Sequence, residues 1–281
     1  MLRRKKAANV QKADEKEMTF FDHLEELRRH ILRSIVAIVV AAIGLFLVGR
    51  PLFDEILFGV RNEHFWSYQF MCKISQSWGL EESLCFQPAD FAIITTGLGE
   101  EFITHIKVAI VGGLVVAFPL VFREFWKFIK PGLYVKERRA TRGVIFVCSF
   151  LFTTGVFFGY FVIAPFAVNF LVSYSIADIE STVTLTSFIN YMIMFTVPAG
   201  LAFELPLVVF YLSKLGLATP EGMRKYRKHA IVAILIVASI ITPPDVVTQF
   251  LIGVPLYFLY EISILVSARE NKRQAKLEAE G

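Results

Sequence analysis

The chain has 281 residues, of which 55% are hydrophobic and 19% charged, and its formal net charge is +4. A soluble domain needs less apolar content, whereas a membrane-spanning helix needs about 20 mostly apolar residues, a length that several segments reach or approach. Positive charge gathers in short segments between the apolar ones instead of on one basic face, which argues against nucleic acid as a partner. The composition therefore predicts an all-α, polytopic membrane protein.

The N-terminal region before the first span has two parts. Residues 1–18 are polar and of mixed charge, and we expect a disordered tail. A helix is expected from Thr19, because Asp22 follows at the spacing of a capping box. Leu24 and Leu27 then follow at helical intervals, which predicts an amphipathic helix that leads directly into the first span. No cleavable signal peptide is expected, because the apolar run starts late and no small-residue cleavage site follows it.

The apolar runs predict six spans, and the loops between them predict the topology. Most of the 29 Lys and Arg lie in the N-terminal region, in the loops at 123–142 and 214–228, and in the charged tail at 267–281. The positive-inside rule places these segments, and so both termini, in the cytoplasm, and the polar loop at about 51–100 in the periplasm. The spans are expected at 31–48, 102–122, 143–168, 189–212, 229–242 and 246–266.

The fifth span is shorter than the others. Its run of about 14 residues covers roughly 21 Å of a hydrocarbon core that is about 30 Å thick. Either the bilayer thins around this span, or spans five and six form a shallow hairpin. Both alternatives return the tail to the cytoplasm, so the charge pattern does not separate them.

Glu204 is an acidic residue near the middle of the fourth span. A carboxylate at the centre of a spanning helix costs about 2.5–3.5 kcal/mol on insertion. Such a residue usually faces a partner, a cavity or an ion pathway; the alternative is a protonated side chain bonded to a neighbouring span. No basic residue lies at the same depth, so no ion pair within the chain is expected.

The cysteines and histidines do not form a pattern typical of a metal site or a catalytic site. Cys72 and Cys85 share the long loop, where a disulfide would close about 14 residues and contribute about 3 kcal/mol to its order; two free thiols are the alternative. Cys148 lies in an apolar run and is expected to be inert. The five histidines lack metal-ligand spacing, and no nucleophile or phosphate-binding motif is present. Neither a metal, another cofactor nor an enzyme activity is predicted.

Four stretches, taken in order, carry a resemblance to a known family. They are HLEELRRHI at 23–31, FREFWKFIKPGLYVKERR at 122–139, FELPLVV at 203–209 and TPPDVVTQ at 242–249. Together they resemble the TatC family, the integral-membrane core of the twin-arginine protein translocase, over about residues 19–266. The resemblance implies a concave six-span bundle with short fifth and sixth helices, in the inner membrane of a bacterium.

The resemblance also implies a function and its residues. A TatC-like protein binds signal peptides that carry paired arginines and helps to export folded proteins, driven by the proton-motive force and without nucleotide or metal. The implied partners are those peptides, small single-span TatA/TatB-type subunits, membrane lipids and further copies of the chain. The implied signal-peptide site comprises Glu26, Leu27, Arg28, Phe128 and Glu137.

Further positions follow from the same resemblance. Glu204 would face a partner's transmembrane helix, and structural or functional motif positions would be held by Pro119, Pro131, Asp245 and Gln249. The loop at about 51–100 is longer than in compact family members, which suggests a lineage-specific cap. A proton- or cation-coupled secondary transporter that uses Glu204 is the rival interpretation, and a membrane scaffold is a third. A repeat that relates the two halves would favour the transporter, and none is apparent.

Overall fold

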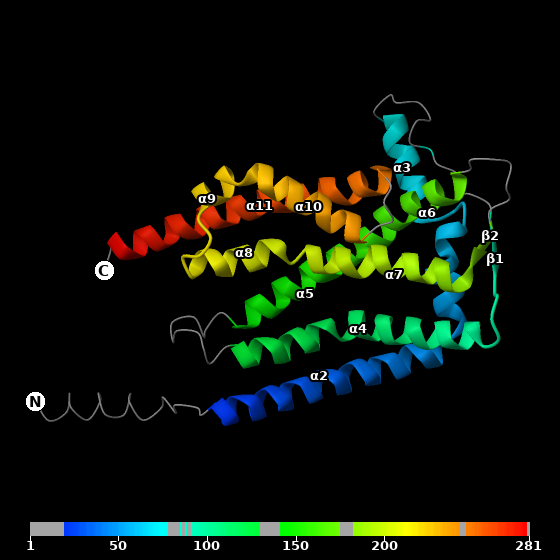
Figure 1. Cartoon of the computed structure of the whole chain (residues 1–281), viewed down its shortest axis with the longest axis horizontal. Coiled ribbons are helices and arrows are strands. Elements are labelled where there is room, and N and C mark those ends of the chain that lie inside the picture. The colour runs from blue at the N-terminus through cyan, green and yellow to red at the C-terminus, as the bar shows by residue number, and fades with distance from the viewer. Residues whose placement is uncertain are drawn as a thin grey trace, which may run out of the picture.

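The computed structural model describes residues 20–77, 85, 88, 91–129, 141–174, 182–241 and 246–279. These residues form a bundle of long helices that run in alternating directions along its length (Figure 1). Among them, five helical stretches are long and apolar enough to cross a membrane. Helix α2 begins and α11 ends at one end of the bundle, which we call the terminal end. Helix α3 and the two strands lie at the opposite end, the cap end (Figure 1).

The first two long helices are α2 (Phe20–Val48) and α4 (Glu100–Ile129), and they pack against each other. The expected amphipathic helix and the first span form one continuous helix, as the apolar stripe indicates. It ends at Gly49, whose φ of +57° is a conformation that glycine adopts without strain. A Cβ on Gly113 of α4 would lie 2.7 Å from the backbone nitrogen of Ala42, so the two helices approach closely at this point.

The loop expected at about 51–100 contains several short elements. They are a π-helical turn (Leu52–Leu57), a 3-10 turn (Phe58–Arg61), α3 (Trp66–Ser77) and β1 (Ala92–Ile94). We refer to residues 52–77 together with β1 as the cap. A disulfide joins Cys72 of α3 to Cys85.

One strand pairing attaches the cap to the rest of the bundle, and one carboxylate joins the helix starts next to it. β1 pairs in parallel with β2 (Thr182–Thr184), with Ala92 opposite Thr182. Glu100, at the start of α4, accepts backbone N–H bonds from Thr96, at 2.6 Å, and from Thr186, at 3.0 Å. A carboxylate near helix N-termini is favoured by the exposed N–H groups there, so one side chain ties the starts of α4 and α7 together.

The centre of the bundle is built by α5 and α7. The helices here are α5 (Thr141–Phe158), a π-helical turn (Gly159–Ile163), α6 (Ala164–Ser173), α7 (Leu185–Ala202) and α8 (Leu205–Lys214). Phe152, Phe188 and Phe195 are each at most 2% exposed. Small residues let the helices meet closely, since a Cβ on Gly155 would lie 2.7 Å from the Ala199 carbonyl oxygen.

The last helices are α9 (Pro220–Lys225), α10 (Arg227–Ile241) and α11 (Val246–Ala279). The fifth expected span corresponds to α10, which has 15 residues and is short, as the sequence indicates. The end of α10 and the start of α11 both lie part-way along the bundle (Figure 1). The sixth expected span, 246–266, differs in length. Its helix α11 has 34 residues and includes most of the expected tail, so it is not a short helix.

Candidate functional site

A cluster of charged side chains lies where α2 begins and α4 ends. Glu124 of α4 is buried, and its carboxylate accepts a hydrogen bond from Lys127 Nζ at 2.5 Å. Its other oxygen lies 2.8 Å from Nδ1 of His30 in α2 and 3.7 Å from an Arg33 guanidinium nitrogen. Burying a carboxylate is unfavourable unless it is paired, so these partners account for Glu124 being tolerated inside the structure.

Several predicted signal-peptide residues surround this cluster. Glu26 is half-buried and lies 3.9 Å from Nε2 of His30. The Phe128 ring meets the His30 ring edge-on, with 6.5 Å between centroids. Leu27 is half-buried beside Glu26, whereas Arg28 is exposed. Glu26 and Phe128 are thus brought together around His30, on two different helices. We call Glu26, His30, Glu124, Lys127 and Phe128 the acidic cluster.

Three predicted positions lie outside the described residues. They are Pro131 and Glu137, in the segment between α4 and α5, and Asp245, between α10 and α11. Pro119 lies within α4, which continues through it to Ile129. Gln249 donates hydrogen bonds to the Leu235 carbonyl oxygen at 3.1 Å and to the Ser239 hydroxyl at 2.7 Å, so it joins α11 to α10.

Glu204 lies at the break between α7 and α8. Pro206 is near the start of α8, and because proline has no N–H and clashes with the preceding turn, the helix is interrupted there. The backbone remains satisfied, since the Glu204 N–H donates to Leu201 and its carbonyl accepts from Leu207. Both carboxylate oxygens are shielded from solvent and lack a well-formed hydrogen bond within the described residues. The Cys148 thiol and the backbone of Phe152 are the polar groups close to this carboxylate.

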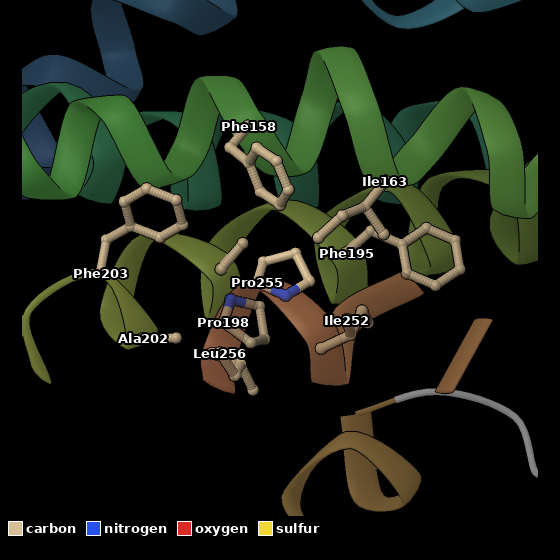
Figure 2. A pocket seen from close by; sticks show the side chains of 10 residues that line it. Phe158, Ile163, Phe195, Pro198, Ala202, Phe203, Ile252, Pro255 and Leu256 are labelled. Carbon is tan, nitrogen blue, oxygen red and sulfur yellow. The ribbon is translucent and has the colours of Figure 1, made fainter. Parts of the chain in front are cut away.

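An apolar crevice lies beside this break. Figure 2 shows Pro198 of α7 next to Pro255 of α11, with Phe158 and Phe203 above them. The enclosed space is about 10 Å³, which is room for a single water at most. Among the described residues, the side chains that line it are all apolar.

Three members of the acidic cluster, His30, Glu124 and Lys127, are not among the residues predicted from the sequence. His30 is one helical turn after Glu26, and that spacing was the available signal. Among the described residues, no group of three or more His, Cys, Asp or Glu is arranged to hold a metal ion.

Comparison with known proteins places the chain in a family. The family model described as "Sec-independent protein translocase protein (TatC)" matches residues 22–255. The chain belongs to the TatC family. Proteins named Sec-independent protein translocase protein TatC are similar to it along almost their whole length. That of Blattabacterium sp. subsp. Periplaneta americana is 34% identical, covering 94% of this chain and 100% of the relative. The TatC protein of Desulforapulum autotrophicum is 33% identical, and the similarity covers 95% of this chain and 90% of the relative.

A solved structure agrees with this assignment. The crystal structure titled as the twin arginine translocase receptor TatC has 30% sequence identity to this chain and a TM-score of 0.69, covering 89% of this chain and 99% of that one. TatC membership confirms the predicted helical membrane fold. It makes the chain a multi-pass membrane component of a protein translocase and not a catalytic enzyme.

Proposed function

We propose that this TatC-family chain is the receptor of a twin-arginine translocase and binds signal peptides at the terminal end of the bundle. The observation that carries the proposal is the acidic cluster. There Glu124 is already paired with Lys127 and His30, whereas Glu26 meets only His30, at 3.9 Å, among the described residues. Glu26 is therefore the carboxylate best able to accept an arginine.

The surroundings of Glu26 suit a guanidinium ligand. A guanidinium offers a planar fork of donors that matches a carboxylate. An exposed ion pair contributes only about 0–1 kcal/mol, but partial burial reduces competition with water. Glu26 is half-buried and lies 3.9 Å from the His30 ring, and Phe128 meets that ring edge-on. Glu137, in the segment that follows α4, is the proposed second acid.

The test measures the affinity of a peptide with paired arginines for the full chain in detergent, against the same peptide with two lysines. Loss of a charge-assisted hydrogen bond costs about 1.5–3 kcal/mol, so we expect Glu26→Gln to weaken the arginine peptide by roughly 10–150-fold. Glu25→Gln is the matched control, because Glu25 is exposed and bonded to Arg29 at 2.5 Å. Equal affinity for the two peptides, or equal effects of the two substitutions, would refute the receptor assignment.

The proposal extends to partners and topology. Glu204 is a shielded carboxylate without a well-formed hydrogen bond to any described residue, so we infer that a polar group on the transmembrane helix of a small TatA/TatB-type subunit supplies that bond. The beginning of α2, the end of α4 and the end of α11 lie at one end of the bundle, which we assign to the cytoplasm of a bacterium (Figure 1). Self-association of the chain and energy from the proton-motive force complete the proposal.

Assembly with the small subunit tests the role of Glu204. We expect Glu204→Ala to leave peptide affinity unchanged while less of the small subunit copurifies with the chain. Glu204→Gln keeps a hydrogen-bonding side chain of the same size, so it should retain part of the assembly. Wild-type amounts of copurified subunit in Glu204→Ala would eliminate this role. TatC membership favours the translocase over a secondary transporter that uses the same residue.

A further inference from the structure

A large apolar cavity lies between the cap and the centre of the bundle, apart from the acidic cluster and from Glu204. Its volume is about 700 Å³. The cap end of α2, the two turns of the cap and the start of α3 cover it, and α4, α5 and α7 form its floor. The floor is mostly aliphatic, and its residues include Val108, Val111, Val115, Ile193 and Val197.

The cavity opens sideways onto a surface that faces lipid. Val116 and Phe157 line it and are 62% and 56% exposed. Both belong to helical stretches that are long and apolar enough to span a membrane. In a bilayer, an opening bordered by these residues faces acyl chains instead of water, so the molecules with direct access to the cavity are lipids.

The volume of the cavity distinguishes between two possible occupants, an acyl chain and a transmembrane helix. A helix about 10 Å wide that rises 1.5 Å per residue occupies roughly 120 Å³ per residue, so the cavity would hold only about six residues. The cavity therefore cannot enclose a spanning helix of about 20 residues. The volume instead falls within the roughly 300–1,000 Å³ of pockets that hold small ligands, a class that includes an acyl chain.

The rim of the cavity lies at the depth of lipid headgroups. Phe161 is 18 residues beyond Gly143, the first residue of its apolar stretch, so it lies about 27 Å along that stretch, close to the roughly 30 Å thickness of a hydrocarbon core. The Trp66 ring contacts Phe161 edge-on at 5.7 Å and stacks on Phe70 at 4.8 Å. Trp66 is 57% exposed. Exposed aromatic rings at this depth are typical of the membrane–water interface.

Polar side chains gather at the same rim. Glu55, Asn62 and His64 line the cavity there, and all three are exposed. The Asn62 Oδ1 atom accepts the His64 backbone N–H at 2.9 Å, so the amide NH₂ of Asn62 is the part of that side chain that can donate. The rim therefore offers a carboxylate for a cation and N–H donors for a phosphate, a complement to a headgroup that carries both charges.

We propose that this cavity binds a zwitterionic glycerophospholipid, with an acyl chain against the floor, the ammonium group at Glu55 and the phosphate near Asn62 and His64. The proposal does not depend on signal-peptide binding, because none of these residues belongs to the acidic cluster. It assigns the cap a second role, as the cover of a lipid site.

Native mass spectrometry of the full chain tests the proposal. The protein is purified in detergent, incubated with vesicles of palmitoyl-oleoyl phosphatidylethanolamine, returned to detergent and washed. We expect one retained lipid per chain, and at least fivefold less in Val111→Trp, which fills the floor. Ile110→Trp is the matched control, because Ile110 is the preceding residue of α4, is 52% exposed and does not line the cavity. It should retain lipid like the wild type, and circular dichroism verifies that both variants keep their helical content.

Three outcomes would overturn the proposal. They are equal lipid retention in Val111→Trp and Ile110→Trp, retention of detergent only, and a retained peptide mass in place of a phospholipid. The headgroup is tested with phosphatidylglycerol of the same acyl chains. We expect at least threefold preference for phosphatidylethanolamine in the wild type and loss of that preference in Glu55→Gln. Equal retention of the two lipids by the wild type would overturn the headgroup assignment.

Discussion

The close contact between α5 and α7 makes a sharp prediction about stability. Glycine to alanine inside a helix is ordinarily favourable by about 0.5–1 kcal/mol. At Gly155, however, the new Cβ would lie 2.7 Å from the Ala199 carbonyl oxygen and 2.8 Å from the Gly200 Cα, whereas ordinary contacts begin at 3.4 Å. These are backbone atoms, so the helices themselves must separate by roughly 0.6 Å, and overpacking of this kind costs about 1–3 kcal/mol. We expect Gly155→Ala to lower the free energy of unfolding by about 1–2 kcal/mol.

Gly143 supplies the control on the same helix. A Cβ there meets nothing within 4 Å among the described residues, so Gly143→Ala should raise the free energy of unfolding by about 0.5–1 kcal/mol. Both variants are titrated with sodium dodecyl sulfate from a mild detergent, and tryptophan fluorescence follows unfolding. Opposite shifts of the midpoint are expected. Shifts of the same sign would refute the reasoning, because they would show that the α5–α7 contact does not limit side-chain size at residue 155.

Two further predictions concern the acidic cluster and the cap. Glu124→Ala should lower the free energy of unfolding by about 1–3 kcal/mol in the same titration, because it removes the carboxylate that binds His30 and Lys127. Glu124→Gln should lower it less, since its amide oxygen still accepts a hydrogen bond. Equal losses in the two variants would contradict this account. Cys72→Ser removes the disulfide, which closes a loop with a sequence separation of 13 and contributes about 3 kcal/mol to the order of that loop. We therefore expect protease to cleave the cap of this variant at least tenfold faster, with unchanged helical content. An unchanged cleavage rate would show that other contacts hold the cap.

The long helices were predictable from the sequence because their apolar runs are long and continuous. Their ends were harder to predict. The second span was expected to stop at residue 122, since the following residues are charged, yet α4 continues to Ile129. Tertiary contacts explain the extension: Glu124 pairs with His30, and the buried Trp126 ring packs 4.9 Å from the Tyr211 ring. No local pattern reveals these partners, which are far apart in the sequence.

The C-terminal end of α11 is a different case. Residues 267–279 are rich in Ala, Glu, Lys, Arg and Gln, all strong helix formers, so the continuation to Ala279 was readable from propensity alone. The strands β1 and β2 were not readable in this way, because each has only three residues and pairs with a segment about 90 residues distant. In the candidate site, the sequence predicted Glu26 and Phe128 but not the histidine between them.

The packing of α2 has a consequence for how the chain is made. Its main contacts are with α4, so the first helical hairpin depends on residues that have all been synthesised by Ile129. That hairpin can therefore form in the membrane while the remaining spans are still being translated. The cap end of this hairpin is completed later in synthesis, because Glu100 binds the Thr186 backbone and β1 pairs with β2. The order of synthesis thus leaves the cap open until the start of α7 has entered the bilayer.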